Sequence, residues 1–186
     1  MNKNCKHLMK NSYFVFLIVI LLLSCSEPIA RKPVVRKTTT VTSEAIKENK
    51  KLIALENSFI EKYIALDSIH KYQVSTHGFW YYYNLKKENE TITPKIGDVV
   101  EFSYTIQQLN GVDIYSKEEL GIKEYAVDKE DFIPGLQEGI KLMKVGEIIT
   151  FVIPSYRAFG LVGDGNRIKI NQTIKSTITL LNIKQK

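Results

Sequence analysis

Residues 131–160 constrain the fold more than any other part of the chain. In order they read as a loop, a short helix that opens on Pro-Gly, an apolar strand, and a turn that ends in an aromatic residue and a glycine. Within the helix, expected from Gly135 to Lys144, apolar side chains recur at helical spacing and share one face. These side chains are Leu136, Ile140 and Met143. So short a helix has to bury that face against another layer of the fold.

Runs rich in β-branched and aromatic residues surround this helix. Strands are expected at 79–85, 99–106, 112–116, 124–127, 148–153 and 175–183. Asn110-Gly111 is the strongest hairpin signal in the chain. The last two strands are expected to alternate between apolar and polar positions. The sequence therefore predicts an α+β fold, in which an antiparallel half-barrel sheet wraps on one short helix.

Residues 1–24 read as a bacterial lipoprotein signal peptide. Three lysines and no acidic residue precede an apolar run at 13–23, which is too short to span a membrane. The run ends Leu22-Leu23-Ser24-Cys25, which resembles a lipobox. Cys25 is therefore the predicted site of lipidation, and an acylated cysteine would hold the protein on a membrane. The alternatives are a simple uncleaved N-terminal anchor or a coincidental cysteine.

The remaining chain divides into three parts. Residues 25–42 mix proline, threonine and basic residues without a period, and a flexible tether is expected there. An amphipathic helix is expected over 43–72, with Ser43 as its N-cap. This helix is too apolar on one side to stand alone, so it either packs on its own domain or pairs with a second copy. Residues 73–186 form the main domain.

Composition and residue spacing argue against several classes of function. The chain of 186 residues has a formal net charge of +6, and without the leader 23 basic residues face 20 acidic ones, which gives +3. This ordinary surface predicts no nucleic-acid partner. The three histidines lack metal-site spacing, and neither a metal nor a cofactor is expected. The glycine-rich run at 160–165 joins two expected strands, so it reads as a flap and not as a phosphate loop.

One stretch resembles the most specific motif of the FKBP-type peptidyl-prolyl cis-trans isomerases. It reads Phe132-Ile133-Pro134-Gly135-Leu136-Gln137-Glu138-Gly139, followed by Met143-Lys144-Val145-Gly146. The resemblance extends over residues 78–184. It implies that the short helix supplies the floor of a proline-sized pocket, and that the turn ending Phe159-Gly160 supplies one wall.

The resemblance also implies which side chains meet the substrate. The catalytic positions would be Tyr104, Tyr115 and Phe159. Tyr115 stands where the family usually has Asp, and Phe159 replaces a Tyr whose hydroxyl hydrogen-bonds the substrate. Leu136 stands where many members have the Trp of the pocket floor. The implied substrate-binding residues are Ile114, Phe132, Ile133, Leu136, Ile168, Ile170 and Thr179.

The function implied is that of a membrane-tethered isomerase that assists the folding of exported proteins. Rotation about an X–Pro bond is slow because it breaks amide resonance, with a barrier of about 18–20 kcal/mol. The twisted amide is less dipolar than the planar one, so a dry apolar pocket favours it without a nucleophile or metal. With its Asp and Tyr hydroxyl positions changed, the resemblance implies reduced activity. The alternative is a non-catalytic peptide-binding or chaperone module.

The segments that precede the domain suggest a biological context. A lipobox, one helix and a single domain that begins Gly78-Phe79-Trp80-Tyr81-Tyr82 are similar to the gliding-motility-associated lipoprotein isomerases of gliding bacteria. The resemblance implies a lipid-anchored protein of the cell envelope that faces the periplasm. Its partners would be proline-containing unfolded or exported polypeptides, with a homodimer through 43–72 as a further option.

Overall fold

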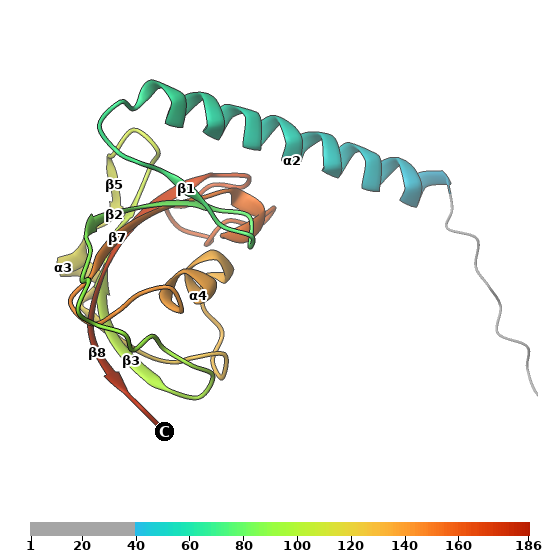
Figure 1. The fold of residues 1–186 in the computed structure, drawn as a ribbon. Coiled ribbons are helices and arrows are strands. Elements are labelled where there is room, and N and C mark those ends of the chain that lie inside the picture. Colours follow the sequence, from blue (N-terminus) through green and yellow to red (C-terminus); the bar gives the residue numbers. More distant parts are fainter. Residues whose placement is uncertain (1–39) are drawn as a thin grey trace, which may run out of the picture. The chain divides into compact units, whose positions relative to one another are not determined.

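A computed structural model describes residues 40–186 (Figure 1). The predicted leader, Cys25 and most of the predicted tether lie outside these residues. Val41–Lys186 form one compact unit with its own hydrophobic clusters. No helix within residues 40–186 combines the length and the apolarity needed to cross a membrane.

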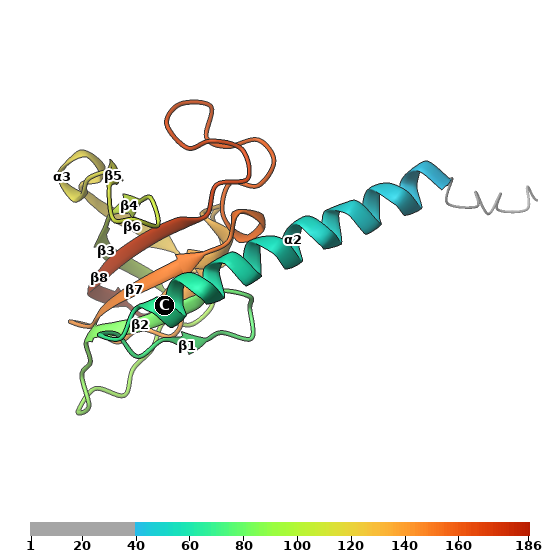
Figure 2. The ribbon, with the colours of Figure 1, turned by 90° about the horizontal axis from the view of Figure 1, so that it is seen from above.

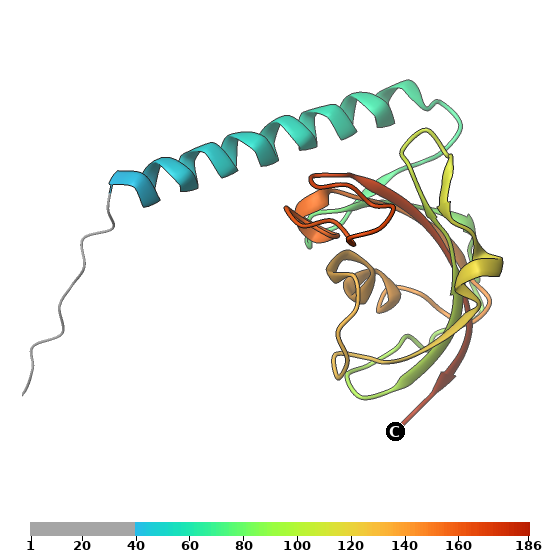
Figure 3. The same ribbon diagram turned by 180° about the vertical axis from the view of Figure 1, so that it is seen from behind.

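The sheet is antiparallel at every pairing and runs in the order β1-β2-β7-β8-β3-β6, with β4 attached to β8 and β5 to β4. The strands are β1 (Gln73–Val74), β2 (Trp80–Leu85), β3 (Val99–Tyr104), β4 (Ile106–Gln107), β5 (Asp113–Tyr115), β6 (Ile122–Ala126), β7 (Ile148–Ile153) and β8 (Ile174–Lys184). The sheet curves around the short helix α4 (Pro134–Ile140), which lies in its hollow (Figures 1 and 3). The predicted α+β half-barrel is confirmed.

Helix α4 packs closely on β7 because its two glycines have no side chains. A Cβ built on Gly135 would lie 2.6 Å from Cγ2 of Ile153, and one on Gly139 would lie 2.6 Å from Cε1 of Phe151. Both separations are far shorter than a normal carbon–carbon contact of about 3.5–4.0 Å. The four-residue spacing puts both glycines on one face of the helix. Glycine at these positions therefore sets the distance between the helix and the sheet.

The helix ends earlier than the sequence predicted. The N–H groups of Leu142 and Met143 donate to the carbonyls of Gly139 and Ile140, three residues back, so the chain tightens into turns after Ile140. The predicted apolar face is nevertheless correct. Leu136, Ile140 and Met143 are all fully buried.

The N-terminal helix α2 spans Thr40–Leu66, in place of the predicted 43–72. Ser43 therefore lies inside the helix and is not its N-cap. At the other end, the carboxylate of Asp67 accepts the backbone N–H groups of Ile69 (3.0 Å) and His70 (3.2 Å). Such local hydrogen bonds compete with a further helical turn, which explains the early end.

Helix α2 packs on its own domain through a small cluster. Ile60 is fully buried against Trp80 and Val152, on the face of the sheet opposite α4. Figure 2 shows α2 crossing over the sheet near β2 and β7. Other apolar side chains of the helix stay exposed, including Leu55 and Phe59. One of the two alternatives left open by the sequence is therefore realised, and pairing with a second copy stays a prediction.

Strand β7 does not alternate as predicted, although β8 does. Phe151 and Ile153 face α4, whereas Val152 faces α2, and all three are fully buried. The hydroxyl of Thr150 is also buried, and it bonds the side chains of Asn84 and Thr177 at 2.8 Å. Coverage by a helix on each face removes the exposed side of the strand.

We expect Gly139→Ala to destabilise the protein. Alanine gains helix propensity, but its methyl group has to push the ring of Phe151 out of a packed core, at a net cost of roughly 1–3 kcal/mol in the free energy of unfolding. Urea denaturation of a fragment spanning residues 40–186 measures this cost. Gln137→Ala, on a less buried part of the same helix, is the control and should stay within about 0.5 kcal/mol.

The clash can be tested directly in a Phe151→Leu background. A smaller side chain there should reduce the penalty of Gly139→Ala, which a double-mutant cycle reports as a coupling energy. An unchanged penalty would show that the ring of Phe151 does not set the helix–sheet distance.

Candidate functional site

A cleft of about 440 Å³ opens beside the N-terminus of α4. One side is the loop that leads into α4, and the opposite side is the turn after the short 3₁₀ helix η1 (Ser155–Arg157). Strands β3, β4 and β5 and the short helix α3 (Lys117–Leu120) complete the lining. The lining residues are Tyr104, Ile106, Tyr115, Leu120, Asp131, Phe132, Ile133, Pro134, Ala158 and Phe159.

Aromatic rings support one wall of this cleft. The ring of Phe132 lies 5.5 Å from that of Tyr104 and 5.7 Å from those of Phe102 and Tyr125. The ammonium group of Lys123 lies 5.2 Å from the centre of the Phe132 ring. Packed rings at these separations hold one another in place. The wall is therefore apolar and preformed.

The hydroxyl of Tyr104, unlike that of Tyr115, makes no hydrogen bond to residues 40–186. Tyr104 is nine-tenths buried and lines the cleft, and within residues 40–186 its hydroxyl has no hydrogen-bond partner. Burial raises the pKa of Tyr104 above its ordinary value of 10.0, so the hydroxyl keeps its proton at neutral pH. The hydroxyl is not among the fully enclosed unpaired atoms of residues 40–186, so it stays accessible from the cleft and suits a ligand that brings an acceptor.

The hydroxyl of Tyr115, by contrast, is committed to the loop that follows η1. It donates to Oδ2 of Asp164 at 2.5 Å and accepts the side-chain amide of Asn166 at 3.2 Å. The guanidinium of Arg167 lies over the Tyr115 ring at 4.8 Å and donates to the carbonyl of Ile114 at 2.8 Å. These contacts tie the loop to the rim of the cleft.

The charge of Asp164 is stabilised by this arrangement. Burial by itself would raise the pKa of its carboxyl group, but hydrogen bonds from the Tyr115 hydroxyl and from the N–H groups of Asn166 and Ile168 outweigh it. The pKa therefore lies below its ordinary value of 3.8. The hydrogen bond to Asp164 is in turn the main reason that the pKa of Tyr115 is raised.

Comparison with known proteins identifies the domain. Residues 90–181 match the family model described as FKBP-type peptidyl-prolyl cis-trans isomerase. This domain belongs to the FKBP-type family. The FKBP-type domain is also similar to the probable FkpA isomerase of Neisseria meningitidis, with 29% identity over 101 residues, and to FkpA of Aeromonas hydrophila, with 31% over 103 residues. These alignments cover 54% and 55% of this chain, but only 37% and 38% of the relatives.

Solved structures of peptidyl-prolyl isomerases share this fold. FkpA from Escherichia coli superposes with a TM-score of 0.58 and 26% identity, over 76% of this chain and 63% of that one. A peptidyl-prolyl isomerase from Pseudomonas syringae also gives a TM-score of 0.58, with 19% identity over 73% of this chain and 96% of that chain. At that identity the second likeness supports the fold alone.

The FKBP-type cleft gathers half of the predicted site residues. Tyr104, Tyr115, Phe132, Ile133 and Phe159 all line it, although they come from β3, β5, the loop before α4 and the turn after η1. Their roles in binding and catalysis stay predictions.

The other predicted residues lie elsewhere. Leu136 is fully buried among the core residues and does not line the cleft, because the leucine side chain stays within the packing between α4 and the sheet. Ile114 and Ile168 are likewise part of the core. Ile170 is exposed in the loop. The prediction for Thr179 requires correction: its neighbours Ile178 and Leu180 face the core, so strand alternation points Thr179 to the other face of the sheet.

Five lining residues were not among the predicted site residues. Asp131, Pro134 and Ala158 are chain neighbours of predicted ones, whereas Ile106 and Leu120 were missed for identifiable reasons. Ile106 belongs to β4, which is separated from β3 at Thr105, whereas one continuous strand was predicted. Leu120 belongs to α3, which was not predicted at all. A signal for α3 was present, because Ser116 and Glu119 have the spacing of a capping box. The structure contains both of its hydrogen bonds.

We expect the carboxyl group of Asp164 to titrate below pH 3.8 in the folded protein. Since its folded-state pKa is lowered, its contribution to stability is present above the ordinary pKa and is lost as the pH falls through the lowered one. NMR titration of the side-chain carboxyl carbon measures the midpoint. Tyr115→Phe should move that midpoint upward, towards 3.8. If the midpoint of Asp164 is the same in Tyr115→Phe as in the wild type, the link between the loop and the rim of the cleft is contradicted.

Proposed function

We propose that this domain catalyses cis-trans isomerisation of X–Pro bonds in polypeptides. The observation that carries the proposal is the preformed apolar cleft with one unpartnered hydroxyl, that of Tyr104. Membership of the FKBP-type family and the similarity to FkpA proteins support it. The chain spans less than two fifths of those curated relatives, so the proposal concerns the domain and not their whole activity.

The proposed reaction requires only that the cleft favour the twisted amide over the planar one. Twisting the amide costs about 18–20 kcal/mol because resonance is lost. The planar amide is the more dipolar form and is favoured by water, so apolar walls such as Phe132 and Phe159 destabilise it relative to the twisted form. Each 1.4 kcal/mol of preference for the transition state gives about a tenfold rate increase. No covalent intermediate is required.

Tyr104 supplies the polar part of this mechanism. Its protonated hydroxyl can donate to a carbonyl oxygen of the substrate, which orients the peptide in the cleft. Phe159 contributes a wall without a hydroxyl, and the hydroxyl of Tyr115 is occupied by Asp164. One polar contact in place of several agrees with the expectation of a slow enzyme.

A domain that binds peptides without catalysing their isomerisation is the second candidate. The same apolar cleft favours it, because walls that accept proline bind it whether or not they stabilise the twisted amide. The two candidates differ in one measurable property. Only an isomerase shortens a refolding phase that is limited by X–Pro rotation, which otherwise lasts about 10–100 s.

We expect the fragment 40–186 to accelerate such a refolding phase in proportion to its concentration. Tyr104→Phe should lower kcat/KM several-fold, since a lost hydrogen bond is worth on the order of 1 kcal/mol. Phe159→Ala should lower it further by admitting water. Tyr81→Phe is the matched control, because its hydroxyl bonds Gln73 away from the cleft.

Two results would contradict this proposal in different ways. Binding of an unfolded chain without any change in the slow refolding phase would favour the peptide-binding module. Equal activity of the wild type, Tyr104→Phe and Phe159→Ala would place the reaction outside this cleft.

We also propose that the domain acts in the cell envelope, tethered by lipid on Cys25 and facing the periplasm. Support comes from the leader at 1–24 and the lipobox-like ending Leu22-Leu23-Ser24-Cys25. Residues 25–42 would be the tether, 43–72 the helical segment and 73–186 the isomerase domain. Its substrates would then be exported polypeptides. Gliding motility as the setting, and dimerisation through 43–72, stay predictions.

Metabolic labelling with a fatty-acid probe tests the anchor. The wild-type chain should incorporate the label and fractionate with membranes, because acyl chains on one cysteine give stable anchoring. Cys25→Ala should lose the label, while Cys5→Ala, inside the leader, should keep it. Label that persists in Cys25→Ala would refute lipidation at this residue.

A further inference from the structure

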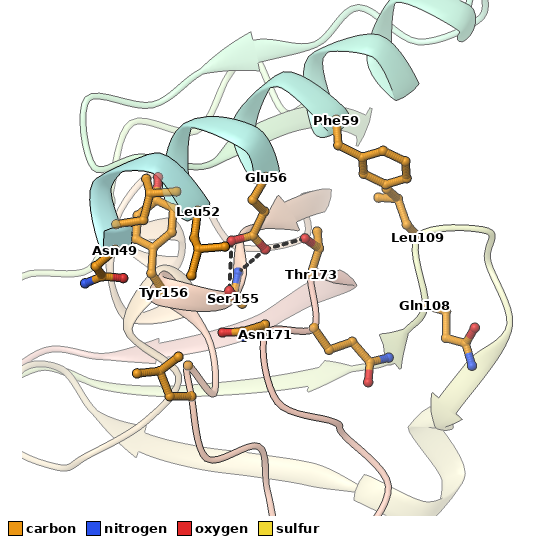
Figure 4. A pocket seen from close by; sticks show the side chains of 14 residues that line it. Asn49, Leu52, Glu56, Phe59, Gln108, Leu109, Ser155, Tyr156, Asn171 and Thr173 are labelled. Carbon is orange, nitrogen blue, oxygen red and sulfur yellow. Dashed lines mark hydrogen bonds between the residues drawn. The ribbon is translucent and has the colours of Figure 1, made fainter. Parts of the chain in front are cut away.

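One carboxylate joins α2 to both ends of the loop that carries a wall of the cleft. The backbone N–H of Ser155 donates to Oε1 of Glu56 at 2.7 Å, and the Ser155 hydroxyl donates to Oε2 at 2.8 Å. The hydroxyl of Thr173 donates to Oε1 at 2.6 Å. Figure 4 shows Glu56 reaching from α2 to both residues. Ser155 lies just after β7 and Thr173 just before β8, so Glu56 binds both stems of the loop just beyond the last β7–β8 pair, Ile153–Ile174.

Backbone hydrogen bonds extend this connection to the cleft. The carbonyl of Ser155 accepts the N–H groups of Ala158 (2.9 Å) and Gly160 (2.8 Å), and the carbonyl of Gly160 accepts the N–H of Asn171 (2.9 Å). Ala158 and Phe159, which line the cleft, lie inside this hydrogen-bonded segment. Ser155 is thus fixed on one side by Glu56 and fixes the cleft wall on the other.

Glu56 also supplies a cap that the local sequence lacks. Helix η1 follows Pro154, whose side chain cannot accept a hydrogen bond from the first N–H of the helix. Ser155 is buried, so an unpaired N–H there would be costly. A carboxylate acceptor makes hydrogen bonds about twice as strong as a neutral one. The cap of η1 therefore comes from a residue 99 positions earlier in the chain.

The carboxylate is presented by a helix that is itself held in place. Ile60 lies one turn after Glu56 on the same face of α2, and it is fully buried against Trp80 and Val152. Val152 belongs to β7, the strand that leads into Ser155. Apolar packing thus fixes the helix on the sheet, and Glu56 transmits that position to the loop.

We propose that Glu56 is a positioning residue of the cleft, so that α2 is a working part of the isomerase domain and not a spacer. This inference rests on the proposed function, since the positioned wall is that of the proline cleft. Glu56 acts through Ser155 and Thr173 on the segment that contains Ala158 and Phe159. Loss of the carboxylate releases Ser155 and Thr173 beyond the β7–β8 ladder and lets this wall move away from the substrate.

Kinetics of the full chain, purified in a mild nonionic detergent, test the proposal. We expect Glu56→Ala to lower kcat/KM by roughly three- to tenfold, mainly through kcat, because a displaced wall loses contacts that matter most in the transition state. Glu56→Gln keeps the shape and one oxygen acceptor and should recover most of the activity. Glu61→Ala removes the same charge from an exposed position of α2 and is the control.

Amide hydrogen exchange gives a readout that does not depend on activity. Glu56→Ala should speed exchange at Gly160 and Asn171, while the emission of Trp80, the sole tryptophan, should stay unchanged because α2 remains docked. If the wild type proves inactive, the proposed function fails, and exchange at these two amides still decides the role of Glu56. Wild-type kinetics together with wild-type exchange in Glu56→Ala would overturn the inference.

A second variant covers the case in which Glu56→Ala releases the helix and shifts the Trp80 emission. Thr173→Val removes one of the three hydrogen bonds and leaves Glu56 bonded to Ser155. A faster exchange at Asn171 with unchanged Trp80 emission supports the proposal. An unchanged exchange rate in Thr173→Val would then count against it.

Discussion

The close approach of α4 to β7 is the contact on which the rest of this structure depends. It requires that no side chain be present at Gly135 and Gly139, because Ile153 and Phe151 occupy the space that a Cβ would need. The loop just before α4 forms one side of the cleft, and the turn after η1, the short helix that follows β7, forms the other. A single helix–strand contact therefore fixes both sides of the site.

The two tyrosine hydroxyls of the cleft have different surroundings. Tyr115 and Phe159 occupy positions where the resemblance implied an Asp and a Tyr. The carboxylate and the hydroxyl reappear as the pair Asp164–Tyr115, but that pair bonds the loop to the rim. The hydroxyl that remains for a substrate is that of Tyr104. In the proposed mechanism, loop order and substrate orientation are thus served by different tyrosines.

The packing of α2 on the sheet buries the second face of β7. Because Ile60 covers Val152 on the face opposite α4, β7 becomes a strand buried on both faces. The same docking brings Glu56 to the beginning and end of the loop behind the cleft. Apolar burial, worth about 1.5–3 kcal/mol for a side chain such as Ile60, thereby holds a charged group where the loop needs an acceptor.

The sequence by itself determined the fold class, the buried face of α4 and five of the cleft residues, because periodicity and a motif of adjacent residues are local properties. It could not place Thr179, whose face depends on strand register. Leu120 was missed although the capping box of its one-turn helix is visible in the sequence. The contacts of Glu56 could not be predicted from the sequence at all. Its partners Ser155 and Thr173 lie 99 and 117 residues away, and only packing of α2 on the sheet brings them within hydrogen-bond distance.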